Sequence, residues 1–398
     1  MGHHLGSKNS IVPLIDRLNK NPIGLVDSEK LRQILALLFN EEEAFVASKF
    51  PLEEATIDEL AQRTGLAEEV LLPLLDNMAD KGLVMDLPYA NTTYYMLMPG
   101  LIGFFEFTFM KDRADLPLPE LARLMTEYLF EDTSQGQAKE VFGSKTSLTR
   151  SLVYDEAVPV SSEVSNYESA REIISSAGYG AAGMCYCRHK KEHLGETCAK
   201  HAPVDGTCIS LGTAARFMVR RGFAVEKSTE ELLAILDQAR ELKLTHITDN
   251  VRHKPTFVCN CCSCCCELMS GVKAGYSDGV AKTAFLAAVD IEKCNDCGLC
   301  FSACNVDAIR SVTSPSGSHA AIDVVPCLGC GACVSACARG AISLVERAER
   351  PIPPEKRKDM FVAILKEKGR LKPYLVSGAK KRARRMFARK KPTRVAPS

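Results

Sequence analysis

Cysteine is absent from the first 184 residues of this 398-residue chain, and all eighteen cysteines follow. The N-terminus has no apolar core segment, so we expect no secretory signal peptide and no disulfide-stabilised secreted domain. The longest apolar stretch, residues 96–110, contains one proline, two glycines and a glutamate and is too short to span a bilayer. We therefore expect a cytoplasmic protein without a transmembrane segment, in which clustered reduced thiols bind metal.

Acidic residues are absent from the end of the chain, residues 370–398, which carry eleven Lys and Arg. The rest of the chain has 39 Lys and Arg (50 − 11) against 49 Asp and Glu, so its net charge is −10. Because the body of the chain is acidic and its tail is basic, the total charge gives no argument for nucleic-acid binding. We expect the tail to be disordered after residue 377.

Nucleotide-binding fingerprints are also absent. The glycine-rich sequence GYGAAG at 178–183 follows a predicted helix, whereas the dinucleotide fingerprint requires a preceding strand. No P-loop sequence occurs. Flavin and nicotinamide sites are therefore not supported.

Helical periodicity and capping signals predict a winged helix over residues 28–110. Thr56 and Glu59 form a capping box, a third helix extends over about 68–81, and two short apolar strands follow as the wing. The reading helix of a DNA-binding domain should be basic, because phosphate neutralisation supplies most non-specific affinity. Residues 53–86 instead contain two basic and nine acidic residues, so DNA is not the expected partner and a protein-docking role is favoured.

The clearest signal is an internal repeat within residues 291–345, offset by 33 residues. Each copy has the spacing C-x₂-C-x₂-C-x₃-C, in which three thiolates on one loop reach one cubane and the fourth reaches the other. We therefore assign Cys294, Cys297, Cys300 and Cys337 to one [4Fe–4S] cluster, and Cys327, Cys330, Cys333 and Cys304 to a second. Zinc also takes four thiolates, but it usually binds two separated CxxC pairs.

This repeat resembles bacterial two-cluster ferredoxins over about 55 residues, with all eight ligand positions matched. The resemblance implies low-potential, one-electron transfer. The chain departs from that family after each fourth cysteine, where Asn305 and Ala338 replace the usual proline. Proline is not a ligand, so the departure leaves cluster identity unaffected but makes the reduction potential less predictable.

Ten further cysteines lie between residues 185 and 266: Cys185, Cys187, Cys198, Cys208, Cys259, Cys261, Cys262, Cys264, Cys265 and Cys266. They could supply two more clusters, one cluster with spare thiols, one larger cluster, or a zinc site with idle cysteines. We predict at least one further iron–sulfur cluster. An extended strand at 259–266 would place Cys262, Cys264 and Cys266 on one face and Cys259, Cys261 and Cys265 on the other.

Neighbouring basic and histidine residues also bear on these thiols. The basic run 188–191 beside CxCR should lower thiolate pKa values, while His201 and His246 are each more often structural than metal ligands. The arrangement over residues 165–345 resembles uncharacterised ferredoxin-domain proteins of anaerobic bacteria, a resemblance that implies no particular reaction.

These patterns predict an α+β multidomain protein. Its segments are a winged-helix-like domain (1–114), a helix and linker (115–147), an α/β cysteine-rich module (148–290), a two-cluster ferredoxin domain (291–345) and a charged tail (346–398). The first functional interpretation is an electron-transfer protein of anaerobic metabolism that serves redox protein partners, as a carrier or as an oxidoreductase subunit. The alternatives are a cluster-based reductase or reductase-activating subunit that uses the middle cysteines, and a redox-sensing winged-helix regulator.

Overall fold

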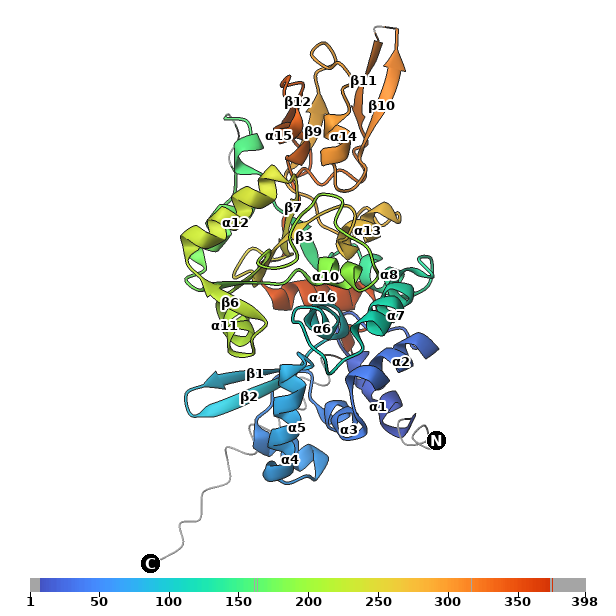
Figure 1. Cartoon of the computed structure of the whole chain (residues 1–398), viewed down its shortest axis with the longest axis vertical. Helices are drawn as coiled ribbons and strands as arrows, with labels where there is room; N and C mark the ends of the chain where they lie inside the picture. Colours follow the sequence, from blue (N-terminus) through green and yellow to red (C-terminus); the bar gives the residue numbers. More distant parts are fainter. Residues whose placement is uncertain (1–7, 161, 163, 316, 373, 375–398) are drawn as a thin grey trace, which may run out of the picture.

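The computed structural model describes residues 8–160, 162, 164–315, 317–372 and 374. The molecule is elongated, with the N-terminal helices at one end and the cysteine-repeat strands at the other (Figure 1). A six-stranded sheet with its helices lies between them, and α16 (Arg357–Glu367) returns across this middle region. The basic tail predicted to be disordered lies outside the described residues.

The N-terminal part is a set of helices followed by a β-hairpin. Its elements are α1 (Lys8–Leu18), α2 (Glu29–Leu38), α3 (Glu41–Lys49), α4 (Ile57–Thr64), α5 (Glu68–Asp80), β1 (Val84–Tyr89) and β2 (Thr92–Leu97). Thr56 caps α4 by accepting the Glu59 N–H at 3.3 Å, and Gly65 ends that helix in the left-handed conformation. These are the elements that the winged-helix interpretation expects, and the winged helix itself stays a prediction.

Four helical segments connect this part to the middle of the molecule. They are η1 (Gly100–Phe104), α6 (Phe105–Thr108) and α7 (Leu118–Phe130), followed by α8 (Gln137–Phe142). The prediction of a linker over 131–147 is wrong where α8 forms, because the side chains of Ala138, Val141 and Phe142 are buried in the main core. The three apolar residues lie in a polar stretch of sequence, which is why this helix was not predicted.

The middle module is built on an antiparallel sheet with strand order β3-β7-β8-β5-β4-β6. The strands are β3 (Thr149–Ser151), β4 (Gly180–Gly183), β5 (Cys208–Leu211), β6 (Ala224–Lys227), β7 (Thr245–Asp249) and β8 (Phe257–Cys261). The surrounding helices are η2 (Asp155–Ala157), α9 (Ala170–Ser176), α10 (Tyr186–Glu192), α11 (Gly212–Arg220), α12 (Thr229–Glu241) and α13 (Glu267–Lys273). The glycine-rich GYGAAG sequence lies mainly in β4, so it does not form a phosphate-binding turn.

The cysteine-repeat unit (residues 285–346) consists of two similar halves. Strand β9 (Phe285–Val289) pairs with β12 (Ile342–Glu346), and β10 (Ile309–Ser314) pairs with β11 (Gly317–Ile322). The short helices α14 (Leu299–Ala303) and α15 (Ala332–Ala336) carry the third cysteine of each copy. The unit begins at β9, before the predicted boundary at 291, because β12 takes β9 as its partner strand.

None of the described helices combines the length and apolar character that crossing a bilayer requires. The three parts share cores rather than folding apart. Phe107 of α6 packs against Phe217 and Phe223 of the middle module, with ring centroids 5.7 and 5.1 Å away.

Candidate metal centres

The outer thiol set consists of Cys294, Cys297, Cys300 and Cys337. Burial raises the pKa of the Cys300 thiol, and the nearby charges of Cys294, Cys297 and Cys337 raise it further. The structure therefore brings the fourth cysteine of the second copy to the first loop, as the spacing predicts. Cys297 is exposed, so this set reaches the surface.

The inner thiol set consists of Cys304, Cys327, Cys330 and Cys333. All four line one cavity. Its empty volume, including the solvent space at its opening, is about 390 Å³. Burial, followed by the charges of Cys330 and Cys327, raises the pKa of Cys304 to about 11. None of these four cysteines is exposed, which distinguishes this set from the outer one.

Backbone amides point at the sulfur atoms of both sets. The Ala308 N–H donates to Cys304 Sγ at 3.2 Å, and the Ala320 and Ala341 N–H groups donate to Cys294 Sγ and Cys337 Sγ at 3.3 Å. Such N–H···S bonds favour the thiolate and stabilise extra negative charge on a bound cluster. The donor set therefore fits two iron–sulfur cubanes, each held by four thiolates.

Asn305 fills the position where related ferredoxins have proline. Its side-chain amide donates to Lys243 O at 2.7 Å and to Thr245 Oγ1 at 3.0 Å, and its oxygen accepts the Ser263 N–H at 3.1 Å. These hydrogen bonds join the repeat unit to β7 and to the middle cysteine run. Proline could make none of these side-chain hydrogen bonds, because it has no polar side-chain atoms.

The inner set faces the middle module. The Thr245 hydroxyl lies 3.7 Å from Cys330 Sγ, and Tyr154 N donates to Cys330 O at 2.9 Å. Lys200 Nζ donates to Lys243 O at 3.0 Å and reaches Ala303 O at 3.4 Å. Sequence reasoning missed Thr245 and Lys200, because neither belongs to a recognisable pattern.

The ten middle cysteines divide into two groups. The six-thiol group (Cys185, Cys187, Cys208, Cys259, Cys261 and Cys266) lines a cavity with an empty volume of about 430 Å³, counted to its opening. The tetrad (Cys198, Cys262, Cys264 and Cys265) gathers beside it, and two of its members, Cys262 and Cys265, also line that cavity.

The predicted grouping of the 259–266 run by strand faces is wrong. Strand β8 ends at Cys261, and the chain then turns through residues 262–266 into α13. The turn sends Cys265 away from Cys259 and Cys261, and it returns Cys266 to them. The alternation of side chains between two faces holds only within a strand, so it cannot group the cysteines that follow the end of β8 at Cys261.

Only Arg188 of the basic run approaches the thiols. It is buried and lines the cavity, donating to Asn260 O at 2.7 Å and to Thr207 Oγ1 at 3.1 Å. Burial alone would lower the pKa of Arg188, but the thiols around it outweigh that effect and raise it. The other basic side chains are engaged elsewhere, with Lys190 bound to Glu267 and Lys191 to Glu196.

The expected lowering of the thiol pKa values does not hold for Cys185 and Cys187. Contact with the Cys187 thiol, followed by burial, raises the pKa of Cys185. Burial is the largest cause of the raised pKa of Cys187. Desolvation of closely packed thiols therefore outweighs the single nearby guanidinium.

Neither histidine lies in a cluster of three or more potential metal-binding side chains among the described residues. His246 Nδ1 lies 2.7 Å from Asn260 Oδ1, and burial lowers the pKa of its imidazole to about 4, so the ring is neutral near pH 7. His201 is exposed and adopts a positive φ of 52° in the turn after Cys198.

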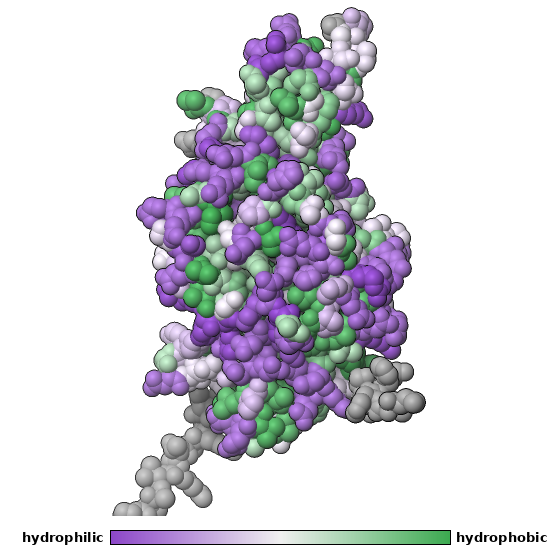
Figure 2. Space-filling model, viewed as in Figure 1, coloured by the Kyte–Doolittle hydropathy of each residue, from purple (hydrophilic) through white to green (hydrophobic). Residues whose placement is uncertain are grey.

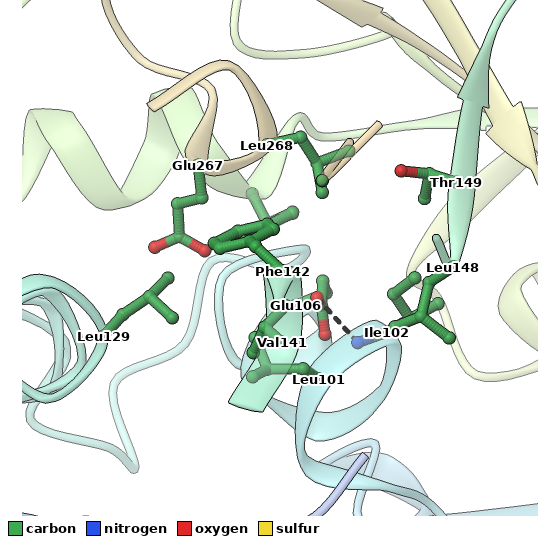
Figure 3. Close-up of a pocket in the computed structure, with 12 residues that line it drawn as sticks. Leu101, Ile102, Glu106, Leu129, Val141, Phe142, Leu148, Thr149, Glu267 and Leu268 are labelled. Atoms are coloured by element: carbon green, nitrogen blue, oxygen red, sulfur yellow. Dashed lines mark hydrogen bonds between the residues drawn. The ribbon is translucent and has the colours of Figure 1, made fainter. Parts of the chain in front are cut away.

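A second pocket adjoins the six-thiol cavity, and both are lined by Tyr186 and Leu268. In Figure 3 the Glu106 carboxylate projects among apolar side chains and accepts the Ile102 N–H at 2.9 Å; the Gly103 N–H also donates to it at 2.7 Å. Burial raises the pKa of Glu106 to about 8. In the sequence, Glu106 stands out only as the single acidic residue of the apolar stretch 96–110.

A family model described as the 4Fe-4S dicluster domain matches residues 293–341. No curated protein and no solved structure matches the chain. The match covers only the cysteine-repeat unit, which is therefore an iron–sulfur, ferredoxin-like domain. The N-terminal part and the middle module have no counterpart in these comparisons.

Proposed function

We propose that the protein transfers single electrons between a redox protein partner, bound at the outer thiol set, and the cysteine-rich middle module. The observation that carries this proposal is the asymmetry between the two thiol sets of the ferredoxin-like domain. The outer set includes the exposed Cys297, whereas the inner set faces Thr245 and Tyr154 of the middle module. A bound cubane supplies one-electron chemistry.

The surface around the outer set is suited to docking. Ile291 and Leu299, which lie close to Cys294 and Cys297 along the chain, have exposed aliphatic side chains. Figure 2 shows apolar side chains gathered at this end of the molecule, with a hydrophilic band across the middle. Exposed apolar side chains rimmed by polar residues are typical of transient protein interfaces.

The six-thiol cavity is the proposed site of a further iron–sulfur cluster. Six thiols exceed the four that one cubane needs, so the group suits a larger cluster or a cubane with spare thiols. Arg188 contributes a buried positive charge that offsets anionic thiolates.

A reductase is the second candidate, and the Glu106 pocket favours it. A carboxyl group with a pKa near 8 holds a proton at neutral pH, and its pocket shares Tyr186 and Leu268 with the six-thiol cavity. In this interpretation Glu106 supplies a proton to a small substrate that receives electrons at the cavity.

The test uses the full-length protein, purified without oxygen, and a pair of equivalent variants, Cys297→Ala in the outer set and Cys330→Ala in the inner set. We expect Cys297→Ala to slow reduction by a reduced ferredoxin at least tenfold, on the order of 1.4 kcal/mol of barrier, while dithionite still reduces the protein. Cys330→Ala should retain fast initial reduction but lose reduction of the middle module. Stopped-flow absorbance and electron paramagnetic resonance measure both steps.

Equal rates for the wild type and Cys297→Ala would contradict the proposal. So would colourless protein that carries zinc and lacks acid-labile sulfide. A small substrate that perturbs the middle-module signal would favour the reductase over the carrier.

A further inference from the structure

The tetrad is the tightest group of thiols in the part of the chain that the structure describes. Its four sulfur atoms all lie within 4.8 Å of one another. Cys198 Sγ is 3.7 Å from both Cys262 Sγ and Cys264 Sγ, and Cys264 Sγ is 3.6 Å from Cys265 Sγ. We propose that the tetrad binds one tetrahedral metal ion, Zn²⁺ or Fe²⁺, and not a [4Fe–4S] cluster.

The distances between the sulfur atoms carry this proposal. Four thiolates around one ion, with metal–sulfur bonds of about 2.3 Å, place the sulfurs about 3.8 Å apart. Three sulfur–sulfur distances of the tetrad, 3.6 to 3.7 Å, match that spacing. In a cubane each thiolate binds a different iron at a different corner, which holds the sulfurs further apart.

The other thiol sets of the same molecule provide an internal comparison. Among the described residues, neither set of the ferredoxin-like domain nor the six-thiol group contains three sulfurs that all lie within 4.8 Å of one another. Within the ranges that the structure describes, the tetrad is therefore the set of cysteines whose sulfurs converge on one point, as a single ion requires. Four thiolates in tetrahedral geometry favour zinc or iron over harder divalent ions.

The surroundings of the tetrad compensate its charge. A divalent ion with four thiolates carries a net charge of −2, and two cations, the buried Arg188 and the partly exposed Lys200, lie close enough to interact with Cys262.

The site is closed, which indicates a structural role. Cys262 and Cys265 are buried, and four protein ligands leave no open coordination position. The ion would join the turn after α10, which carries Cys198, to the turn between β8 and α13. It would thereby fix the wall between the six-thiol cavity and the inner thiol set.

The test measures metals in the full-length protein purified without oxygen and without added iron. We expect Cys264→Ala and Cys198→Ala each to lose one equivalent of zinc, or one equivalent of iron with no loss of acid-labile sulfide. Cys208→Ala, in the six-thiol group, serves as the matched control and should retain that ion. Unchanged ferredoxin-type paramagnetic signals in all three variants would show that the electron-transfer domain is intact, so this test is independent of the proposed function.

X-ray absorption at the zinc edge, or at the cobalt edge after growth with Co²⁺, needs no variant. We expect four sulfur neighbours at about 2.3 Å and no metal neighbour. Loss of about four irons and four sulfides with Cys264→Ala would overturn the proposal, because those are the contents of a cubane. A disulfide within the tetrad, or no metal lost from either variant, would also overturn it.

Discussion

Glu106 is a buried carboxyl group whose protonation affects stability. Its pKa rises from 4.5 to about 8 on burial, so the folded protein binds more protons than the unfolded chain between these pH values. The protonated carboxyl therefore contributes stability that is fully present below pH 4.5 and is lost as the pH rises towards 8.

The substitution Glu106→Gln tests this linkage. We expect the wild type to lose several kcal/mol of unfolding free energy between about pH 5 and pH 8, and the variant to lose much less. The variant should also be less stable at about pH 5, by about 1–3 kcal/mol, because an amide can accept only one of the two backbone N–H bonds. Urea unfolding followed by circular dichroism measures both effects, since the chain has no tryptophan.

The exposed Glu69→Gln in α5 serves as the control and should leave the pH profile unchanged. Parallel pH profiles for the wild type and Glu106→Gln would refute the assignment.

The sequence predicts some individual residues better than others. Cysteine spacing predicts the two four-thiol sets, because thiolate geometry on a short loop limits which sulfurs can meet. Cys198 and Cys264 could not be paired from the sequence, because their approach depends on two turns that are distant along the chain. From the sequence, Asn305 was only a departure from the family pattern. Its hydrogen bonds to Lys243 and Thr245 explain why an asparagine occupies this position.

The two cysteine loops of the repeat differ in the space around them. Asp296 and Gly329 are equivalent by the offset of 33 residues, and both have positive φ, 55° and 71°. A Cβ atom at Gly329 would lie 2.0 Å from Phe285 O, so the inner loop packs directly on β9. The outer loop has room for an aspartate side chain because it faces solvent.

Gly329→Ala should disrupt the inner loop. We expect a loss of more than about 3 kcal/mol of unfolding free energy, because the added Cβ collides with backbone and is strained at this φ. The inner set should then lose about four irons, whereas the outer set retains its own. Iron and sulfide quantitation and urea unfolding measure the two effects.

Gly340→Ala is the matched control for this element. Gly340 also has positive φ, 61°, but a Cβ there meets nothing within 4 Å. This variant should cost only about 1–2 kcal/mol and keep both clusters. Equal damage by the two substitutions would show that the close approach to β9 is unimportant.

Secondary structure was predicted well where one side of an element is buried and its end is capped. Helix α12 begins with a capping box, a sequence-readable start signal, in which Ser228 and Glu231 are bonded reciprocally. The cysteine run was predicted poorly, because thiols have neither strong turn preferences nor a period that identifies the end of a strand. Helix α8 was missed because its few buried side chains lie within a polar sequence.

At the scale of the whole molecule, Arg221 joins the N-terminal part to the middle module. Its guanidinium donates to Asp76 at 2.7 Å and to Asp80 and Asp86 at 2.9 Å. Burial alone would lower the pKa of Arg221, but these carboxylates outweigh it and raise the pKa. The acidic face that disfavours DNA binding is therefore partly used to bind the middle module.

Arg221→Ala should loosen this junction. We expect a loss of about 2–4 kcal/mol of unfolding free energy, because the buried Asp86 loses one of its two arginine partners. Faster limited proteolysis between the N-terminal part and the middle module should accompany it. Arg123→Ala, which removes an exposed helix ion pair with Glu127, should cost less than about 0.5 kcal/mol. If the two variants behave alike, the junction does not depend on Arg221.

The order of segments along the chain was predictable, but their association was not. Cysteine distribution and the repeat separated the N-terminal part, the middle module and the cysteine-repeat unit. Contacts such as Phe107 with Phe223, and the pairing of β9 with β12, join residues far apart in sequence and leave no local pattern. The boundaries at 114 and 291 are thus less distinct in space than in composition.

Adjacent cysteines of the middle run belong to different sites. Cys261 and Cys266 belong to the six-thiol group, whereas their immediate neighbours Cys262 and Cys265 belong to the tetrad. One peptide bond joins Cys261 to Cys262 and another joins Cys265 to Cys266, so the two centres are linked at two points. An ion that orders the sulfurs of one centre therefore also positions those of the other. A group bound at either centre should therefore restrict the backbone of residues 261–266.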